Sequence, residues 1–382
     1  MLGYKYRIDL TVAQPRRDRI EFAMGTLKIA LALAIGHGAA LIGAGVARAE
    51  DSALLYNGGD RQERLIEGAR REGEVTLYSS MIVNQTQRPI AEAFGRKYPF
   101  LKMSYWRAES AGIFAKLSAE SRAGNLVADL VEGTGVGEVA VEAGLAEPYF
   151  TPEVDAIPSI YRDANGVWTA TRRSFFSAAY NTRLVAPEAT PKRYEDLLDP
   201  RWKGRIAWHI GSSSGADLFV TNLRLSWGEE RARTYLMQLA QQKPVSISGA
   251  SARALVDRVI AGEYAIALNI FAHHPLISHA KGAPALPALM EPVATTVGTM
   301  IVPKGVHHPN AALLLADFIL SAEGQAILAK ADYFPTRVDT PSSPALSPIT
   351  DALATTHEQF VSPDALVKYT PTSAAMIREI FQ

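Results

Sequence analysis

The chain has 382 residues, 39 Lys and Arg against 39 Asp and Glu, and no cysteine. This even balance of charge excludes the basic surface that nucleic acids or anionic lipids require. The absence of cysteine excludes disulfides, cysteine nucleophiles, thiolate zinc sites and iron–sulfur clusters.

Residues 24–49 have the pattern of a secretory signal peptide. Lys28 precedes an apolar run rich in Ala and Gly, and the run ends in Ala-Arg-Ala at 47–49, the small-x-small pattern that signal peptidase requires. A membrane anchor needs about 20 strongly apolar residues without breaks. We therefore predict that residues 1–49 are a signal peptide and that the protein is exported. The polar segment before Met24 is unusually long for such a peptide, which leaves open a translation start at Met24.

Removal of the signal peptide leaves 32 Lys and Arg against 36 Asp and Glu, a net charge of about −4. The roughly 330 remaining residues exceed what one hydrophobic core usually supports, so we expect two lobes.

From residue 74, short β-rich runs alternate with helical patterns, which is typical of parallel sheets covered by helices. We predict strands at 74–79, 101–105 and 128–132. Helices are predicted between them: one capped by Asn84 or Thr86 and running through Phe94, one from a Ser110 cap to Gly124, and a short one ending at Gly144.

Residues 154–181 break this alternation. They contain Asn165-Gly166, a dipeptide typical of hairpin turns, and the extended runs VWTAT and FFSAAYN. We interpret this region as long antiparallel strands that cross from the first lobe to the second.

The strand and helix alternation then resumes. Strands are predicted at 205–210, 245–248, 265–270 and 296–302, and helices from Ser213 and at 229–242, 251–260, 310–320 and 322–329. We therefore divide the chain into a signal peptide (1–49), the first part of lobe 1 (50–153), a crossover (154–181), lobe 2 (182–272), a return to lobe 1 with packing helices (273–339), and a linker with a C-terminal helical tail (340–382).

The run GSSSG at 211–215 lies between a predicted strand and a predicted helix. It matches the G-x-S-x-G turn of serine hydrolases, with Ser213 as nucleophile and with Asp257 and His307 or His308 following in the right order. No oxyanion-hole segment of the HGGG type precedes it, so we rank a hydrolase last.

The same run suits anion binding. Small residues at a helix start leave backbone N–H groups open, and these groups and the helix dipole favour negative charge. We predict that the segment binds an anionic group of a ligand, through Ser213, Ser214, Gly215 and Ala216.

Other candidate ligand contacts stand at the ends of predicted strands or the starts of predicted helices, where crevice ligands bind in α/β sheets. An arginine in the crossover can also clamp a carboxylate or phosphate with two hydrogen bonds. The adjacent pairs His273-His274 and His307-His308 cannot chelate a metal unaided, because adjacent side chains point apart. The candidates are Ser79, Ser80, Thr134, Arg173, Ser251 and His273.

Several segments together resemble one protein family. EVTLYSS, ADLVEGTG, AAYNTRLV, PKRYEDLLDPRWKGRIAW, AGEYAIALNI, GTMIVPKGVHHPNAALLLADFILSAEGQAILA and YFPTR are similar to the ferric-iron type of periplasmic solute-binding proteins of ABC importers. The resemblance covers residues 73–337. It implies a type II binding-protein fold, in which two three-layer α/β/α lobes joined by crossover strands hold a ligand in the cleft between them.

The resemblance also implies a range of ligands: ferric iron, thiamine, polyamines, phosphonates or phosphorylated sugars. The iron binders have a histidine where this chain has Ile82, a glutamate where it has Thr134, and a tyrosine pair at Ala272-His273. Ferric iron prefers phenolate and carboxylate oxygen. The resemblance therefore implies the fold and the transport role, whereas binding of bare ferric iron fits these residues poorly.

These observations predict a periplasmic binding protein, not an enzyme, that captures a small anionic solute and delivers it to an inner-membrane ABC permease. The solute is expected to be an organic phosphonate, a phosphate ester or a carboxylate. Two alternatives stay open: an iron-binding protein that uses His273 and a tyrosine such as Tyr78, and a serine hydrolase built on Ser213. We expect a monomer with no cofactor, no bound metal and no nucleic-acid partner.

Overall fold

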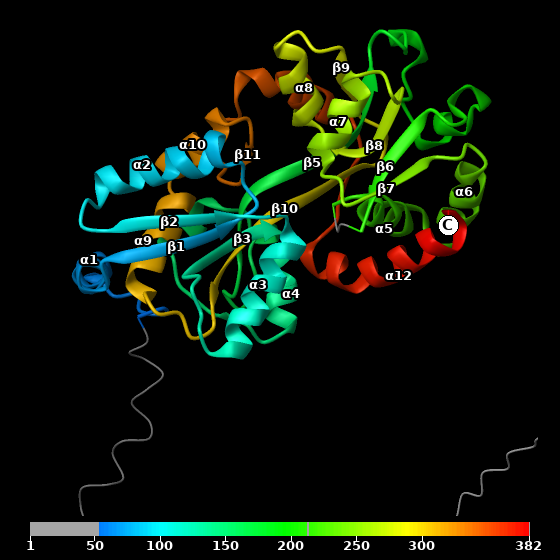
Figure 1. The fold of residues 1–382 in the computed structure, drawn as a ribbon. Coiled ribbons are helices and arrows are strands. Elements are labelled where there is room, and N and C mark those ends of the chain that lie inside the picture. The colour runs from blue at the N-terminus through cyan, green and yellow to red at the C-terminus, as the bar shows by residue number, and fades with distance from the viewer. Residues whose placement is uncertain (1–52, 212–213, 382) are drawn as a thin grey trace, which may run out of the picture. The chain divides into compact units, whose positions relative to one another are not determined.

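The computed structural model describes residues 53–211 and 214–381 (Figure 1). In this part of the chain, two α/β lobes share one mixed sheet with the strand order β2-β1-β3-β10-β5-β8-β6-β7. Each lobe has helices on both faces of its strands. The predicted signal peptide lies outside the described residues, so its cleavage stays a prediction.

Lobe 1 is built on the parallel strands β2, β1 and β3. The first strand follows its sequence prediction residue for residue, but the next helix starts later than predicted, because a π-helical turn occupies Val83–Gln87. Ser110 begins its helix without capping it, since Glu109 is the N-cap residue. The elements of lobe 1 are α1 (Arg61–Glu72), β1 (Glu74–Ser79), α2 (Arg88–Lys97), β2 (Lys102–Arg107), α3 (Ser110–Ala123), β3 (Leu130–Thr134), α4 (Val136–Glu142) and β4 (Ala146–Glu147), with β10 (Val293–Pro303), α9 (Pro309–Leu320), α10 (Ala322–Lys330) and β11 (Phe334–Pro335) from later in the chain.

Lobe 2 repeats the parallel arrangement, with β6 between β7 and β8. Its apolar clusters place α5, α6 and α12 on one face of these strands and α7 on the other. The elements of lobe 2 are β6 (Ile206–Ile210), α5 (Ala216–Trp227), α6 (Glu229–Ala240), β7 (Val245–Ser248), α7 (Ala252–Ile260), β8 (Ile266–Phe271), α8 (His273–Ala280), β9 (Ala285–Ala288) and α12 (Pro363–Phe381).

Two antiparallel strands join the lobes. The extended runs predicted after Asn165-Gly166 form one strand, β5 (Thr169–Asn181), whose first half pairs with β10 and whose second half pairs with β8. A bulge at Thr171 shifts the pairing of β5 with β10 by one residue opposite Gly298. In Figure 1, β5 and β10 run together from one lobe to the other.

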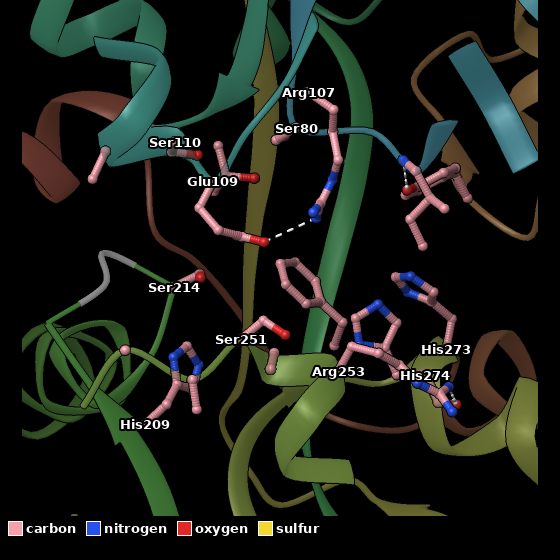
Figure 2. Close-up of a pocket in the computed structure, with 18 of the residues that line it drawn as sticks. Ser80, Arg107, Glu109, Ser110, His209, Ser214, Ser251, Arg253, His273 and His274 are labelled. Atoms are coloured by element: carbon pink, nitrogen blue, oxygen red, sulfur yellow. Dashed lines mark hydrogen bonds and ion pairs between the residues drawn. The ribbon is translucent and has the colours of Figure 1, made fainter. Parts of the chain in front are cut away.

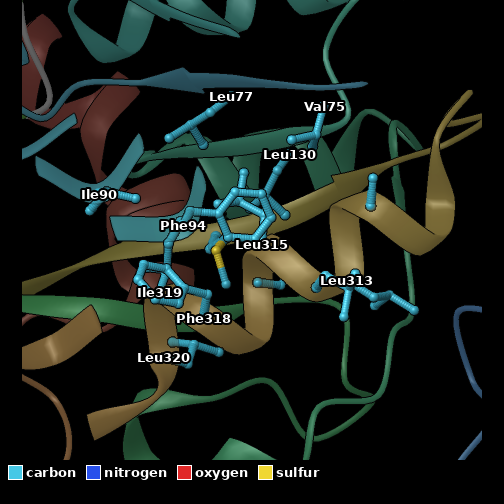
Figure 3. Packing of buried hydrophobic residues seen from close by; sticks show 14 of the residues in the cluster. Val75, Leu77, Ile90, Phe94, Leu130, Leu313, Leu315, Phe318, Ile319 and Leu320 are labelled. Carbon is cyan, nitrogen blue, oxygen red and sulfur yellow. The ribbon is translucent and has the colours of Figure 1, made fainter. Parts of the chain in front are cut away.

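The core of lobe 1 surrounds α9 (Figure 3). Every residue from Ala311 to Leu320 is buried, because α1, α2, α10 and β1 all pack against this helix. A helix that is apolar all round is stable where it is enclosed on all sides. Among the described residues, no helix is by itself long and apolar enough to cross a membrane, and only α9 and α10 taken together pass that test, across a 60° bend.

The C-terminal region was predicted as a surface linker followed by a helical tail. The helices are present, as α11 (Ser347–Leu353) and α12, but the segment before them is not wholly on the surface. Leu346 is fully buried against Phe175 and Phe334, because one apolar side chain anchors an otherwise polar stretch. The short strand β12 (Glu358–Phe360) then pairs with β10, and α12 packs on α5, α6 and α4.

The first turn of α9 is capped by a side chain from another helix. Glu72, the last residue of α1, accepts hydrogen bonds from the backbone N–H groups of Asn310 and Ala311 at 3.1 and 2.7 Å. We expect Glu72→Ala to lower the free energy of unfolding by about 1–2 kcal/mol in urea denaturation. Glu67→Ala in the same helix removes an exposed pair with Arg71 and should cost less than about 0.5 kcal/mol. Equal losses would contradict the capping role.

Candidate ligand-binding site

A cavity of about 260 Å³ lies between the two lobes, beside β5. Lobe 1 contributes the ends of β1, β2 and β3 and the start of α3, and lobe 2 contributes the ends of β6 and β8 and the starts of α7 and α8 (Figure 2). The carboxyl ends of parallel strands from both lobes therefore meet at one space. This is the crevice in which open α/β sheets bind ligands.

Four helices begin at this cavity. Its wall includes the first residues of α3 and α8, the N-cap of α7 and a residue two positions before α5, which are Ser110, His273, Ser251 and Ser214. In α3, α5 and α8 the N-cap residue makes no side-chain hydrogen bond to the helix. Their first N–H groups and dipoles together favour a negative charge in the cavity.

The segment before α5 is held by lobe 2 itself. Asn269, which has a φ of 52°, donates from its side-chain amide to the carbonyl oxygens of Ser214 and Gly215 at 2.9 and 2.8 Å. A Cβ atom on Gly215 would come within 2.9 Å of the His209 ring, so this backbone approaches the ring as closely as glycine permits. The start of α5 is thereby fixed against the cavity wall.

Arg172 supplies the fixed cation of the site. Its side chain is almost fully buried and forms an ion pair with Glu132, and its Nη2 donates to Ser80 Oγ at 3.0 Å. Its guanidinium lies 5.3 Å from the ring centre of Tyr333. Ser79 Oγ donates to the same Glu132 carboxylate at 2.6 Å. A buried charge is tolerated only when it is paired and hydrogen-bonded, as it is here.

Three histidines line the cavity as neutral groups. Burial lowers the pKa of His209 to about 4, and burial together with nearby Arg172 lowers the pKa of His273 to about 3. Burial and the adjacent charges also lower the pKa of His274. Both ring nitrogens of His209 and the Nδ1 atoms of His273 and His274 make no hydrogen bond within the described protein. Each imidazole can therefore offer a hydrogen bond to a ligand without adding charge.

The other two cavity arginines also have carboxylate partners. Arg107 pairs with Glu109 at 2.9 Å in an exposed pair, which is dashed in Figure 2. Arg253 pairs with Asp257 at 2.7 Å and donates to Ser278 Oγ at 2.7 Å. Exposed ion pairs contribute little stability, so Arg107 can exchange its partner for a ligand at low cost.

Five of the predicted ligand contacts line this cavity: Ser80, Thr134, Ser214, Ser251 and His273. Thr134 is buried and its hydroxyl makes no hydrogen bond within the described protein. Gly215 and Ala216 form the start of α5 behind the wall, and Ser213 lies outside the described residues.

Two predicted contacts point elsewhere. Ser79 is fully buried and its hydroxyl is used by Glu132, so it does not reach the cavity. Arg173 donates from Nε to the carbonyl oxygen of Pro335 at 3.2 Å, on the opposite face of β5 from Arg172. We therefore assign the crossover arginine of the site to Arg172 instead of Arg173.

Sequence reasoning did not propose several residues of the cavity wall: Arg107, Glu109, Ser110, His209 and Tyr333. It named Arg172 and His274 only as members of the pairs Arg172-Arg173 and His273-His274. The end of the predicted second strand was the available signal for Arg107 and Glu109, since strand ends face the crevice. Tyr333 reaches the cavity from near β11, and no local pattern marks it.

The hydrolase alternative gains no support from the described residues. His308 Nδ1 lies 3.0 Å from Asp129 in lobe 1, whereas Asp257 pairs with Arg253 in lobe 2, so these groups do not form one relay. Residues 53–211 and 214–381 contain no group of three or more His, Asp or Glu side chains placed to hold a metal ion.

A sequence profile of bacterial extracellular solute-binding proteins matches residues 126–360, the part that contains both crossover strands and all of lobe 2 except α12. The chain belongs to this family. Its members bind small ligands, work with ABC permeases and are not enzymes. The resemblance inferred from the sequence motifs is thereby confirmed, together with the two-lobed type II fold.

Individual relatives show the range of the family. An uncharacterized protein of Haemophilus influenzae is 30% identical over 281 residues, which are 68% of this chain and 76% of the relative. The structure of AfuA from Actinobacillus pleuropneumoniae with fructose-6-phosphate bound is 27% identical, with a TM-score of 0.63, over 72% of this chain and 88% of AfuA. Iron-bound HitA from Pseudomonas aeruginosa is 21% identical, with a TM-score of 0.69, over 81% of this chain and 99% of HitA, and shows likeness of fold.

Proposed function

We propose that this protein is the periplasmic binding component of an ABC importer for a small solute with an anionic oxygen group. The solute is an organic phosphonate, a phosphate ester or a carboxylate, and it is delivered to an inner-membrane permease without chemical change. The observation that carries this proposal is the convergence of four helix starts on the cavity that Arg172 lines. The phosphorylated sugar bound to AfuA supports the same class of ligand.

The remaining parts of the proposal follow from the sequence. A cleavable signal peptide directs the protein to the periplasm, where it acts as a monomer and uses neither a cofactor nor nucleic acid. Lobe boundaries at residues 153, 181, 272 and 339 belong to the same proposal, with β5 and β10 as the hinge.

Ferric iron remains the alternative ligand, because the structurally similar HitA is iron-bound. In this chain the tyrosine named for that role, Tyr78, donates its hydroxyl to Glu120 at 2.6 Å and does not line the cavity. Burial and the contact with Glu120 raise the pKa of the Tyr78 hydroxyl above its usual value, which opposes a phenolate ligand. Tyr333 is the one tyrosine among the described lining residues.

A thermal-shift panel of phosphonates, phosphate esters, carboxylates and ferric iron identifies the ligand, since a solute that binds only the folded state raises its melting temperature. The proposal is then tested with Ser251→Asp. Ser251 caps α7 by accepting from the N–H of Ala254 at 3.2 Å, and aspartate caps equally well while it adds a negative charge to the cavity. A like charge about 7 Å from the ligand costs about 2 kcal/mol at an effective dielectric of about 20, which is about 30-fold in Kd.

Ser321→Asp is the matched control. Ser321 caps α10 in the same way, by accepting from the N–H of Gly324 at 3.2 Å, but it does not line the cavity. We expect this variant to bind with unchanged Kd in calorimetry. Equal affinity of both variants and the parent protein for the identified anion would overturn the proposal, as would a response of the panel to ferric iron alone.

A further inference from the structure

A second hollow adjoins the proposed ligand cavity. It is a groove of about 320 Å³ that runs along α7 and α8 of lobe 2 and meets lobe 1 at Ile82 and Gln85. Four residues line both the cavity and the groove: Ile82, Arg253, His273 and His274. The two spaces are therefore adjacent.

The groove differs from the cavity in chemistry. Ile82, Ile260 and Ile277 supply most of its apolar wall, and Lys281 stands at its exposed rim. None of the described residues that line the groove carries a carboxylate, whereas Glu109 lines the cavity. A wall of this kind suits an aliphatic group of a ligand, because burial of apolar surface is favourable and does not depend on direction.

The junction between the two spaces carries no free charge. The rings of His273 and His274, whose centres lie 4.6 Å apart, are neutral, and Figure 2 shows them beside Arg253. Arg253 is held by Asp257 and by Ser278 Oγ. An aliphatic chain of a ligand that leaves the cavity here passes imidazole rings that can form hydrogen bonds but carry no charge. Its passage therefore removes little water from charged groups.

We propose that this groove binds the aliphatic end of the solute whose anionic group occupies the cavity. This inference rests on the proposed function and adds the shape of its ligand, an amphiphilic organic anion. Ligand pockets usually measure about 300–1,000 Å³. The cavity alone, at about 260 Å³, lies just below this range, and the cavity and the adjoining groove together lie within it.

The test uses n-alkyl phosphonates and n-alkyl carboxylates from one to six carbons, with affinities measured by calorimetry. We expect the Kd to fall about fourfold for each methylene that enters the groove, until the groove is filled. Ile277→Trp fills the groove from α8 and should abolish this dependence, while binding of the one-carbon member is kept. Val338→Trp is the control, because Val338 is 76% exposed and lines neither space.

The outcomes separate the two proposals. If the Kd does not depend on the alkyl chain length, the proposal that the groove binds the aliphatic end is overturned. The same holds if Ile277→Trp and Val338→Trp show the same dependence of Kd on chain length. Either result leaves the proposed function intact. Failure of every alkyl phosphonate and every alkyl carboxylate to bind overturns the groove proposal, and the proposed function falls with it only if the phosphate esters of the thermal-shift panel also fail to bind.

Discussion

Replacement of Arg172 by methionine should lower the free energy of unfolding by about 3–5 kcal/mol at neutral pH. The variant leaves the Glu132 carboxylate fully buried, with only the hydroxyls of Ser79 and Thr171 as partners. Loss of one member of a buried ion pair has this cost, since the remaining charge is uncompensated. Urea denaturation monitored by circular dichroism measures it.

Two comparisons test the cause of that loss. Arg172→Met combined with Glu132→Gln removes both charges and should recover most of the stability without restoring affinity for the anionic solute. Arg173→Met, on the other face of β5, should cost less than about 1 kcal/mol. A double variant as unstable as Arg172→Met would show that the uncompensated charge is not the cause of the loss.

Replacement of Gly298 by alanine should also be strongly destabilising, by about 3 kcal/mol. A Cβ atom at this position would lie 2.7 Å from Arg172 Cζ and 2.7 Å from Glu132 Oε1, far inside contact distance. The buried ion pair between Arg172 and Glu132 would have to move to make room. The strands β5 and β10 are packed closely beside it, so a new position for the two side chains would be strained.

Gly95→Ala should change the stability of the same protein in the opposite direction. Gly95 lies inside α2, and no atom stands within 4 Å of the position that a Cβ atom would take there, so alanine should raise stability by about 0.5–1 kcal/mol. Both changes are measured as shifts of the urea midpoint. A loss of less than about 1 kcal/mol in Gly298→Ala would mean that the ion pair relocates freely.

The strands and helices that pack as regular layers could be predicted from the sequence. β1 and β7 were predicted to the residue, because alternating or β-branched runs end at clear turn residues. α1 was not predicted, although its buried residues Arg61, Leu65, Gly68 and Ala69 lie at helical spacing and mark one face of the helix.

The site was predicted less completely because side-chain direction depends on pairing. The bulge at Thr171 sets which of Arg172 and Arg173 faces the cavity, and a bulge reverses the alternation of side chains beyond it. Sequence can identify the arginine pair but not the register opposite Gly298. Contacts from distant segments, such as Tyr333, depend on the assembled lobes.

The placement of the C-terminal helix affects the order in which the chain can fold as it is synthesised. Met376 and Ile377 of α12 belong to the main apolar cluster of lobe 2, and the central helix of lobe 1 comes from residues 309–320. Neither lobe can complete its core until most of the polypeptide has left the ribosome, and contacts between distant segments form slowly. Completion of both cores therefore depends on segments from the last quarter of the sequence.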